Sequence, residues 1–137
     1  MPITKKPGRQ EVIAATADFT FADVTSGTYA GAVDVPAGAI VVGGHLAITT
    51  IFNSATDDKF SIGDQVGVAA ASAATYAAQS ADITAPGAVE IVPTGKKYAE
   101  PSTVGVVWTG TGAAPSAGVA RLTVLYIVDG RAAFSHG

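Results

Sequence analysis

The sequence predicts an all-β protein, an antiparallel β-sandwich of jelly-roll type with about eight strands. Valine, threonine, glycine and alanine dominate the 137 residues, whereas leucine occurs only three times, and β-branched residues favour strands over helices. Short apolar stretches between turn residues recur at a spacing of about 8–12 residues, which is typical of sandwiches and barrels. No alternation of strands with long helices is visible, so a parallel sheet is not expected. This pattern does not separate a jelly roll from an immunoglobulin-like sandwich.

The expected strands follow one another along the chain, each bounded by turn residues. Their ranges are 11–15, 18–21, 28–35, 39–53, 59–63, 88–92, 103–109, 119–128 and a short final 132–134. In the longest strand, alternation places on one face Ile40, Val42, Gly44, Leu46, Ile48, Thr50 and Phe52. The glycine pair at 43–44 indicates a bulge or a bend in that strand. The Ala-rich stretch 68–81 is expected to form a short helix or an irregular crossover, because alanine favours helix.

The core is expected to consist of the apolar side chains that share a face within the strongest strands. These are Leu46, Ile48, Phe52, Val106, Trp108, Leu122, Val124 and Tyr126. In the short strand 59–63, Phe60 and Ile62 are expected to point inward by the same alternation.

Residues 1–9 differ in composition from the rest of the chain. They contain Lys5, Lys6 and Arg9 together with two prolines and one glycine, so we expect an extended basic N-terminal arm without a core of its own. Residues 10–137 have the usual size of one domain and are expected to form a single β-sandwich.

The charge distribution limits the classes of partner. Charged residues make up only 14% of the chain. Three of the eight cations lie in the arm, so residues 10–137 carry five positive and eleven negative charges, a net charge of −6. Such a body lacks the basic face that nucleic-acid binding requires, and a weakly charged surface favours packing against copies of the same chain. No apolar run reaches the about 18 residues of a membrane span, and Gln10 and Glu11 stand where a signal peptide would be apolar.

No pattern predicts catalysis or a cofactor. Cysteine is absent, which excludes disulfides, thiolate nucleophiles and Cys-ligated metals. His45 has no nucleophile or orienting carboxylate nearby in the sequence, so a structural or surface role is expected, and His136 is the penultimate residue. The stretch 93–97 lacks the spacing and the hydroxyl of a phosphate-binding loop and is expected to be a turn followed by solvated lysines. We therefore expect no enzyme.

Two further site hypotheses stay open at this point. Calcium needs clustered oxygen ligands, and the chain offers a loose group of them in Asn53, Asp57, Asp58 and Asp64. Their spacing lacks the EF-hand pattern, and such residues are also common in hairpin turns. Trp108 and Tyr98 could form a stacking platform for a sugar, whereas core packing is the ordinary role of such rings. No particular pair among the eleven acids stands out for glycoside hydrolysis.

Several stretches resemble the small head-decoration, or cement, proteins of tailed bacteriophages. They are AVDVPAGAIVVGG at 32–44, LAITTIFN at 46–53, FSIGD at 60–64 and SAGVARLTVLYIVDGRAAF at 116–134. The resemblance covers about residues 18–134, and it concerns the texture and order of motifs, not a catalytic signature.

The resemblance implies a jelly-roll-like sandwich that self-associates, as a dimer or a trimer. It further implies that the chain binds the major capsid protein on the outside of the virion head and stabilises the shell, after synthesis in the cytoplasm of a bacterial host. Lys5, Lys6 and Arg9 are then expected to contact the capsid. The alternative is a carbohydrate-binding or receptor-binding fibre domain of a virion, which exposed aromatic rings near Trp108 would favour. A small hydrolase or isomerase would need buried carboxylates around His45.

Overall fold

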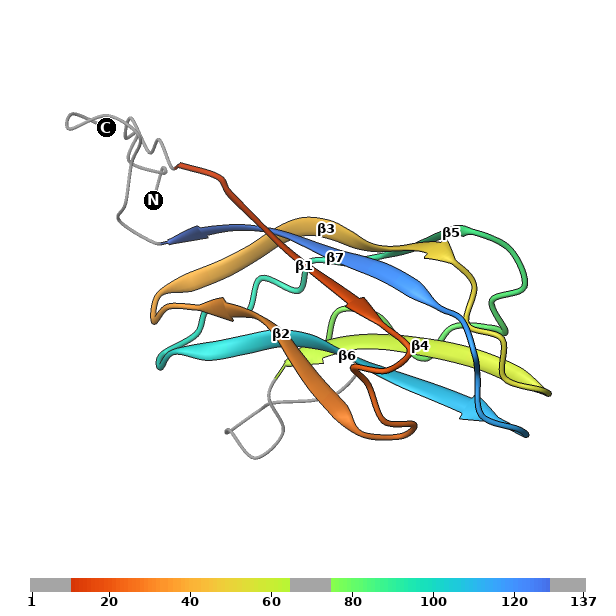
Figure 1. The fold of residues 1–137 in the computed structure, drawn as a ribbon. Coiled ribbons are helices and arrows are strands. Elements are labelled where there is room, and N and C mark those ends of the chain that lie inside the picture. Colours follow the sequence, from red (N-terminus) through yellow and green to blue (C-terminus); the bar gives the residue numbers. More distant parts are fainter. Residues whose placement is uncertain (1–10, 65–74, 129–137) are drawn as a thin grey trace, which may run out of the picture.

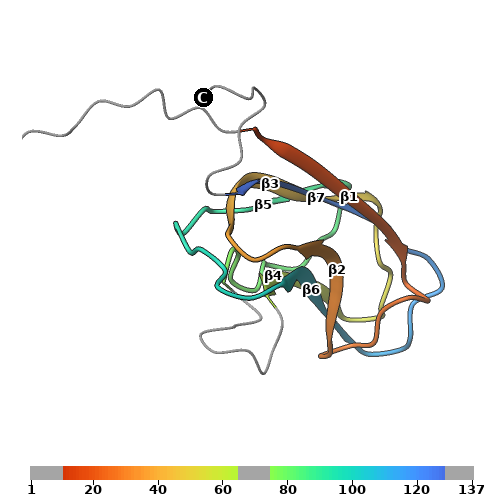
Figure 2. The same ribbon diagram turned by 90° about the vertical axis from the view of Figure 1, so that its left-hand side faces the viewer.

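The computed structural model describes residues 11–64 and 75–128, which form two antiparallel β-sheets (Figure 1). The four-stranded sheet has the order β1 (Ile13–Thr20), β7 (Val119–Val128), β3 (Ala39–Thr50) and β5 (Gly87–Glu90). The three-stranded sheet has the order β2 (Tyr29–Val35), β6 (Ser102–Thr111) and β4 (Asp57–Asp64). Figure 2 shows the two sheets as separate layers. Successive strands alternate between the layers, as in a jelly roll, and the predicted all-β sandwich is confirmed.

The first strand differs from the prediction, which placed two short strands at 11–15 and 18–21. Eight consecutive residues of β1 pair with β7 without an irregularity, from Ile13 opposite Tyr126 to Thr20 opposite Val119. The residues between the two predicted strands carry no turn signal, so the pairing continues through them. The other described strands lie within a few residues of their predicted ranges. The predicted strand 132–134 lies outside the described residues.

Strand β3 contains the bulge that its glycine pair predicts, and the bulge inverts the face of the residues before it. The pairing with β7 shifts register between Val41 and Gly43. Ala39 and Val41 are therefore buried, with exposed fractions of 0% and 1%, whereas Val42 is 41% exposed. The prediction that Ile40 and Val42 share the buried face of the strand is wrong, because one extra residue reverses the alternation.

The core lies between the sheets and has the predicted composition. Phe52 packs at one end of it, with its ring centroid 5.1 Å from that of Phe60 and 5.5 Å from that of Trp108. Phe60 and Ile62 of β4 are fully buried, as predicted. The eight side chains expected in the core are all at most 9% exposed: Leu46, Ile48, Phe52, Val106, Trp108, Leu122, Val124 and Tyr126.

One side of the sandwich is closed by residues 75–83, which we call the closing segment. It lies along the outer edge of β4 and takes the position of an eighth strand. The backbone hydrogen bonds that join the two run from Ile62 N to Ala77 O, Tyr76 N to Ile62 O, Ser80 N to Phe60 O, and Ile83 N to Asp58 O. Residues 75–81 contain no helix, so the irregular form of the predicted crossover is the one found there. Residues 68–74 lie outside the described part of the chain.

A buried polar network holds the closing segment to the sandwich. The carboxylate of Asp64, at the end of β4, is fully buried and accepts hydrogen bonds from Thr75 Oγ1 at 2.8 Å, Lys96 Nζ at 2.5 Å and Tyr98 Oη at 2.9 Å. The Tyr98 hydroxyl also lies 2.5 Å from that of Tyr76. Lys96 was expected to be a solvated lysine, and this is wrong: its side chain is only 22% exposed and forms an ion pair with Asp64.

The two tyrosines of this network resist ionisation. Burial raises the pKa of Tyr76, and burial together with the hydrogen bond between the two hydroxyls raises the pKa of Tyr98. The negative charge of Asp64 raises the pKa of both tyrosines as well. Tyr98 therefore stays protonated and donates to the carboxylate, which leaves this buried acid satisfied.

Replacing Leu122 by alanine should lower the free energy of unfolding by about 2–5 kcal/mol. The side chain is fully buried in β7, so its loss leaves a cavity between the sheets. Urea denaturation followed by the fluorescence of Trp108 measures the change. Val92→Ala is the control, because Val92 is 64% exposed and its truncation should change the free energy by less than about 0.5 kcal/mol. Equally small effects at both positions would contradict the placement of Leu122.

Alkaline pH should destabilise the fold through the buried tyrosines. Their folded pKa values lie above the ordinary 10.0, so above about pH 10 the unfolded chain releases protons that the folded chain keeps, and the free energy of unfolding falls. Denaturation curves measured from pH 8 upward, with tyrosinate absorbance as a second signal, test this. Tyr98→Phe should make the fall with pH less steep, because one contributing group is gone. A folded protein whose tyrosines all ionise near pH 10 would refute the network.

Candidate assembly surfaces

The four residues considered as calcium ligands are not brought together. Asn53 Oδ1 accepts hydrogen bonds from two backbone amides, those of Ser116 and Ala117, at 2.8 and 3.0 Å. Asp57 lies 3.7 Å from Lys59 Nζ, and Asp64 belongs to the buried network. Across residues 11–64 and 75–128, no group of three or more His, Asp or Glu side chains is arranged to hold a metal ion.

The proposed sugar platform does not exist, because both of its rings are in the interior. Trp108 is 5% exposed and Tyr98 is 4% exposed. Trp108 Nε1 donates a hydrogen bond to Asp58 Oδ1 at 2.9 Å, and Asp58 Oδ2 accepts from the Ser54 amide at 3.0 Å. The two aromatic side chains therefore serve the core, and the carbohydrate-binding hypothesis loses the feature that suggested it.

The outer face of the four-stranded sheet is polar around His45. This half-buried residue lies opposite Thr123 of β7 and Glu90 of β5. Beside it, Arg121 forms an ion pair with Asp18 of β1 through two hydrogen bonds of 2.6 and 3.2 Å. The hydrogen bond from Arg121 lowers the pKa of Asp18. The described residues place no buried carboxylate cluster around His45, which the hydrolase hypothesis required.

The same outer face becomes apolar where β1 and β3 begin and β7 ends, at one end of the sandwich in Figure 1. Val12 and Val42 are 57% and 41% exposed, and Ile40 lies directly opposite Ile127 in the β3–β7 pairing. Ile40, Leu125 and Ile127 are half-buried. We call these five residues the apolar patch. Packing the patch against another protein surface would remove apolar area from water.

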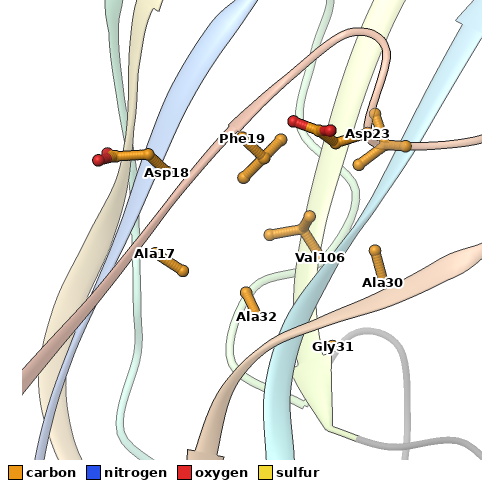
Figure 3. A pocket seen from close by; sticks show the side chains of 9 residues that line it. Ala17, Asp18, Phe19, Asp23, Ala30, Gly31, Ala32 and Val106 are labelled. Atoms are coloured by element: carbon orange, nitrogen blue, oxygen red, sulfur yellow. The ribbon is translucent and has the colours of Figure 1, made fainter.

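A cleft of about 210 Å³ separates the edge strands β1 and β2, and we call it the edge cleft (Figure 3). Figure 3 shows Asp23 at one end of the cleft, whereas Asp18 points away from it. The side chains that form its walls and floor are small or apolar: Ala17, Phe19, Val24, Ala30, Ala32 and Val106.

The arm residues Lys5, Lys6 and Arg9, and likewise His136, lie outside the described residues, so their roles stay predictions.

Sequence reasoning missed the Asp64 network and the edge cleft. Neither has a local signal, because the partners of Asp64 lie 11 to 34 positions away along the chain and the cleft joins two strands of different sheets. No helix in the described part of the chain is long and apolar enough to span a membrane.

No protein-family model and no curated protein matches the sequence. Chains in three solved bacteriophage capsid structures do have a similar fold. A chain of the cyanophage Pam1 capsid asymmetric unit matches with a TM-score of 0.66 and 19% identity, over 93% of this chain and 92% of that one. A chain of the acid-stable capsid of Helicobacter pylori bacteriophage KHP30 matches with a TM-score of 0.59 and 17% identity, over 86% and 92%.

A chain of the capsid of Ralstonia phage GP4 matches with a TM-score of 0.58 and 19% identity, over 92% of this chain and 90% of that one. At such identities the likeness establishes a shared fold. The near-complete coverage on both sides means that the whole sandwich is shared, not one sheet or one hairpin of it.

Proposed function

We propose that this protein is a structural component of a bacteriophage virion that binds the outside of the head and stabilises it as a decoration protein. The observation that carries the proposal is the fold likeness to chains of three phage capsid structures, which extends over at least 86% of this chain and 90% of each neighbour. The stretches of sequence that resemble head-decoration proteins point the same way. In this role the protein is made in the cytoplasm of the host and has no catalytic activity.

The outer face of the four-stranded sheet supports this function. It presents an apolar patch with Val12 and Val42 exposed, next to a polar area with one exposed ion pair. A surface of this kind binds another protein over a broad area without a deep pocket. Contacts that are weak individually give a large combined affinity when they are repeated over a lattice of major capsid protein subunits.

The basic arm supplies a second kind of contact in this proposal. Lys5, Lys6 and Arg9 meet acidic groups of a neighbouring subunit or of the capsid. One exposed ion pair contributes about 0–1 kcal/mol, so the arm has an appreciable effect only where several copies bind side by side.

The purified protein should form a homo-oligomer, a dimer or a trimer. Few charges and an exposed apolar patch favour contact between copies. Light scattering on a sizing column should give a mass at least twice the 13.6 kDa of the chain. Val42→Asp places a charge in the patch without disturbing the core and should reduce that mass if the patch forms the contact. A monomer at micromolar concentration would refute self-association.

Deletion of residues 1–9 should weaken decoration of expanded heads that lack the protein. Co-sedimentation of the intact and truncated forms with such heads, at low and at moderate salt, measures the occupancy. Salt should weaken the intact form more than the truncated one, because screening acts on the charges that the arm supplies. Equal occupancy by both forms at every salt concentration would contradict a role of the arm, and absence of binding by either form would contradict the decoration function.

A further inference from the structure

The two long sides of the sandwich differ in how their edge strands are paired. On one side, the closing segment hydrogen-bonds to the outward backbone groups of β4 between Asp58 and Ile62, and the four-residue strand β5 forms the other edge. On the other side lie the edge strands β1 and β2. Among the described residues, no backbone hydrogen bond joins another segment to the outer edge of β1 between Ile13 and Phe19, or to that of β2. Unpaired edges of this kind readily accept a further extended chain.

Strand β1 is the better template of the two. It is regular over eight residues, and it has neither proline nor lysine, which commonly protect edge strands. Strand β2 has a register irregularity between Gly31 and Val33, which makes regular pairing along it less favourable. A segment that pairs with β1 on its free side would extend the four-stranded sheet across the edge cleft.

The walls of the edge cleft leave room for side chains of such a segment. Ala17 of β1 and Ala30 and Ala32 of β2 project only methyl groups into it, above a floor that includes Val106. The cleft is therefore apolar inside and large enough for an aliphatic side chain. At its rim, Asp23 accepts hydrogen bonds from Thr20 but takes part in no ion pair with any described residue.

We propose that the edge cleft receives the N-terminal arm, residues 1–9, of a neighbouring copy of the same chain. The arm has the complementary chemistry. Ile3 is a branched aliphatic side chain that suits the alanine-lined interior, and Lys5, Lys6 and Arg9 bring three positive charges to a body whose net charge is −6. This inference rests on the self-association in the proposed function and identifies where one copy contacts the next.

The chain's own arm is poorly placed to bring its positive charges to Asp23 of its own cleft. It joins the body at residue 11, at the start of β1, whereas the cleft extends to Asp23 beyond the other end of that strand. An arm reversing at residues 10–11 would set Lys5 beside Thr16 and Thr4 beside Ala17, so it would reach the near end of the cleft but leave its cations well short of Asp23. The arm of a neighbouring copy has no such constraint. Exchange between copies can therefore bring the positive charges of one arm to Asp23 of another copy.

The absence of cysteine from the chain permits a direct test. Thr4→Cys places a single thiol in the arm, and this variant is activated as a mixed disulfide with thionitrobenzoate. Mixed with reduced Ala32→Cys, it exchanges to a disulfide between the two chains and releases one thionitrobenzoate anion per bond. Ala88→Cys, on the exposed face of β5 at the opposite edge of the same sheet, is the matched control.

At micromolar concentration we expect release with Ala32→Cys to be at least about tenfold faster than with Ala88→Cys, because docking raises the effective concentration of the arm thiol. A peptide of residues 1–9 and added salt should both reduce this difference. Equal rates at the two positions overturn the proposal. A doubly substituted Thr4→Cys/Ala32→Cys chain that closes at a rate independent of concentration also overturns it, since the arm would then occupy its own cleft.

The test separates this inference from the proposed function because it uses the isolated protein. A protein that decorates heads but shows no preference for Ala32→Cys refutes the arm exchange alone. A protein that shows the preference but does not bind heads refutes the decoration role alone.

Discussion

A fully buried carboxylate needs hydrogen-bond donors around it. At Asp64 this requirement fixes the positions of the closing segment and of the loop before β6. Its partners are a threonine and two residues of the loop before β6, with a second tyrosine behind them. They come from segments without regular secondary structure, which would otherwise have little reason to adopt one position. Because all of them converge on one acid at the end of β4, the segment 75–83 is held along that strand and the sandwich is closed there.

The opposite side of the sandwich has no comparable polar network, so the two sides differ in structure. There the edges of β1 and β2 border a cleft lined by small side chains, and no carboxylate of that region is buried. A closed side suits a protein that must not aggregate through its edges, whereas an open side suits one that joins its copies in a defined order. Both properties would serve the proposed role, in which many copies pack on a shell.

The bulge in β3 determines which side chains are exposed on the outer face of the four-stranded sheet. Gly44 has a φ of 127°, and a Cβ there would lie 2.1 Å from the carbonyl oxygen of Thr123, so the close approach of β3 and β7 depends on glycine. The extra residue turns Val42 outward. As a result, a strand that alternates evenly in the sequence buries Val41 and leaves an apolar area on the surface, where contact with another protein becomes favourable.

The sequence by itself determined the fold class and the core, because alternation with period two and turn residues are local properties that the sheets then bury. Leu46, Phe52 and Leu122 could be assigned to the core from their own strands alone. Tertiary structure decided the rest. The face of Val42 depended on a register shift against β7, and the role of Lys96 depended on a carboxylate 32 residues earlier. From the sequence, Trp108 and Tyr98 could belong either to a sugar-binding platform or to the core. Only the packing of the two layers shows that both rings are buried. The edge cleft lies between strands of two different sheets, so no local pattern could contain it.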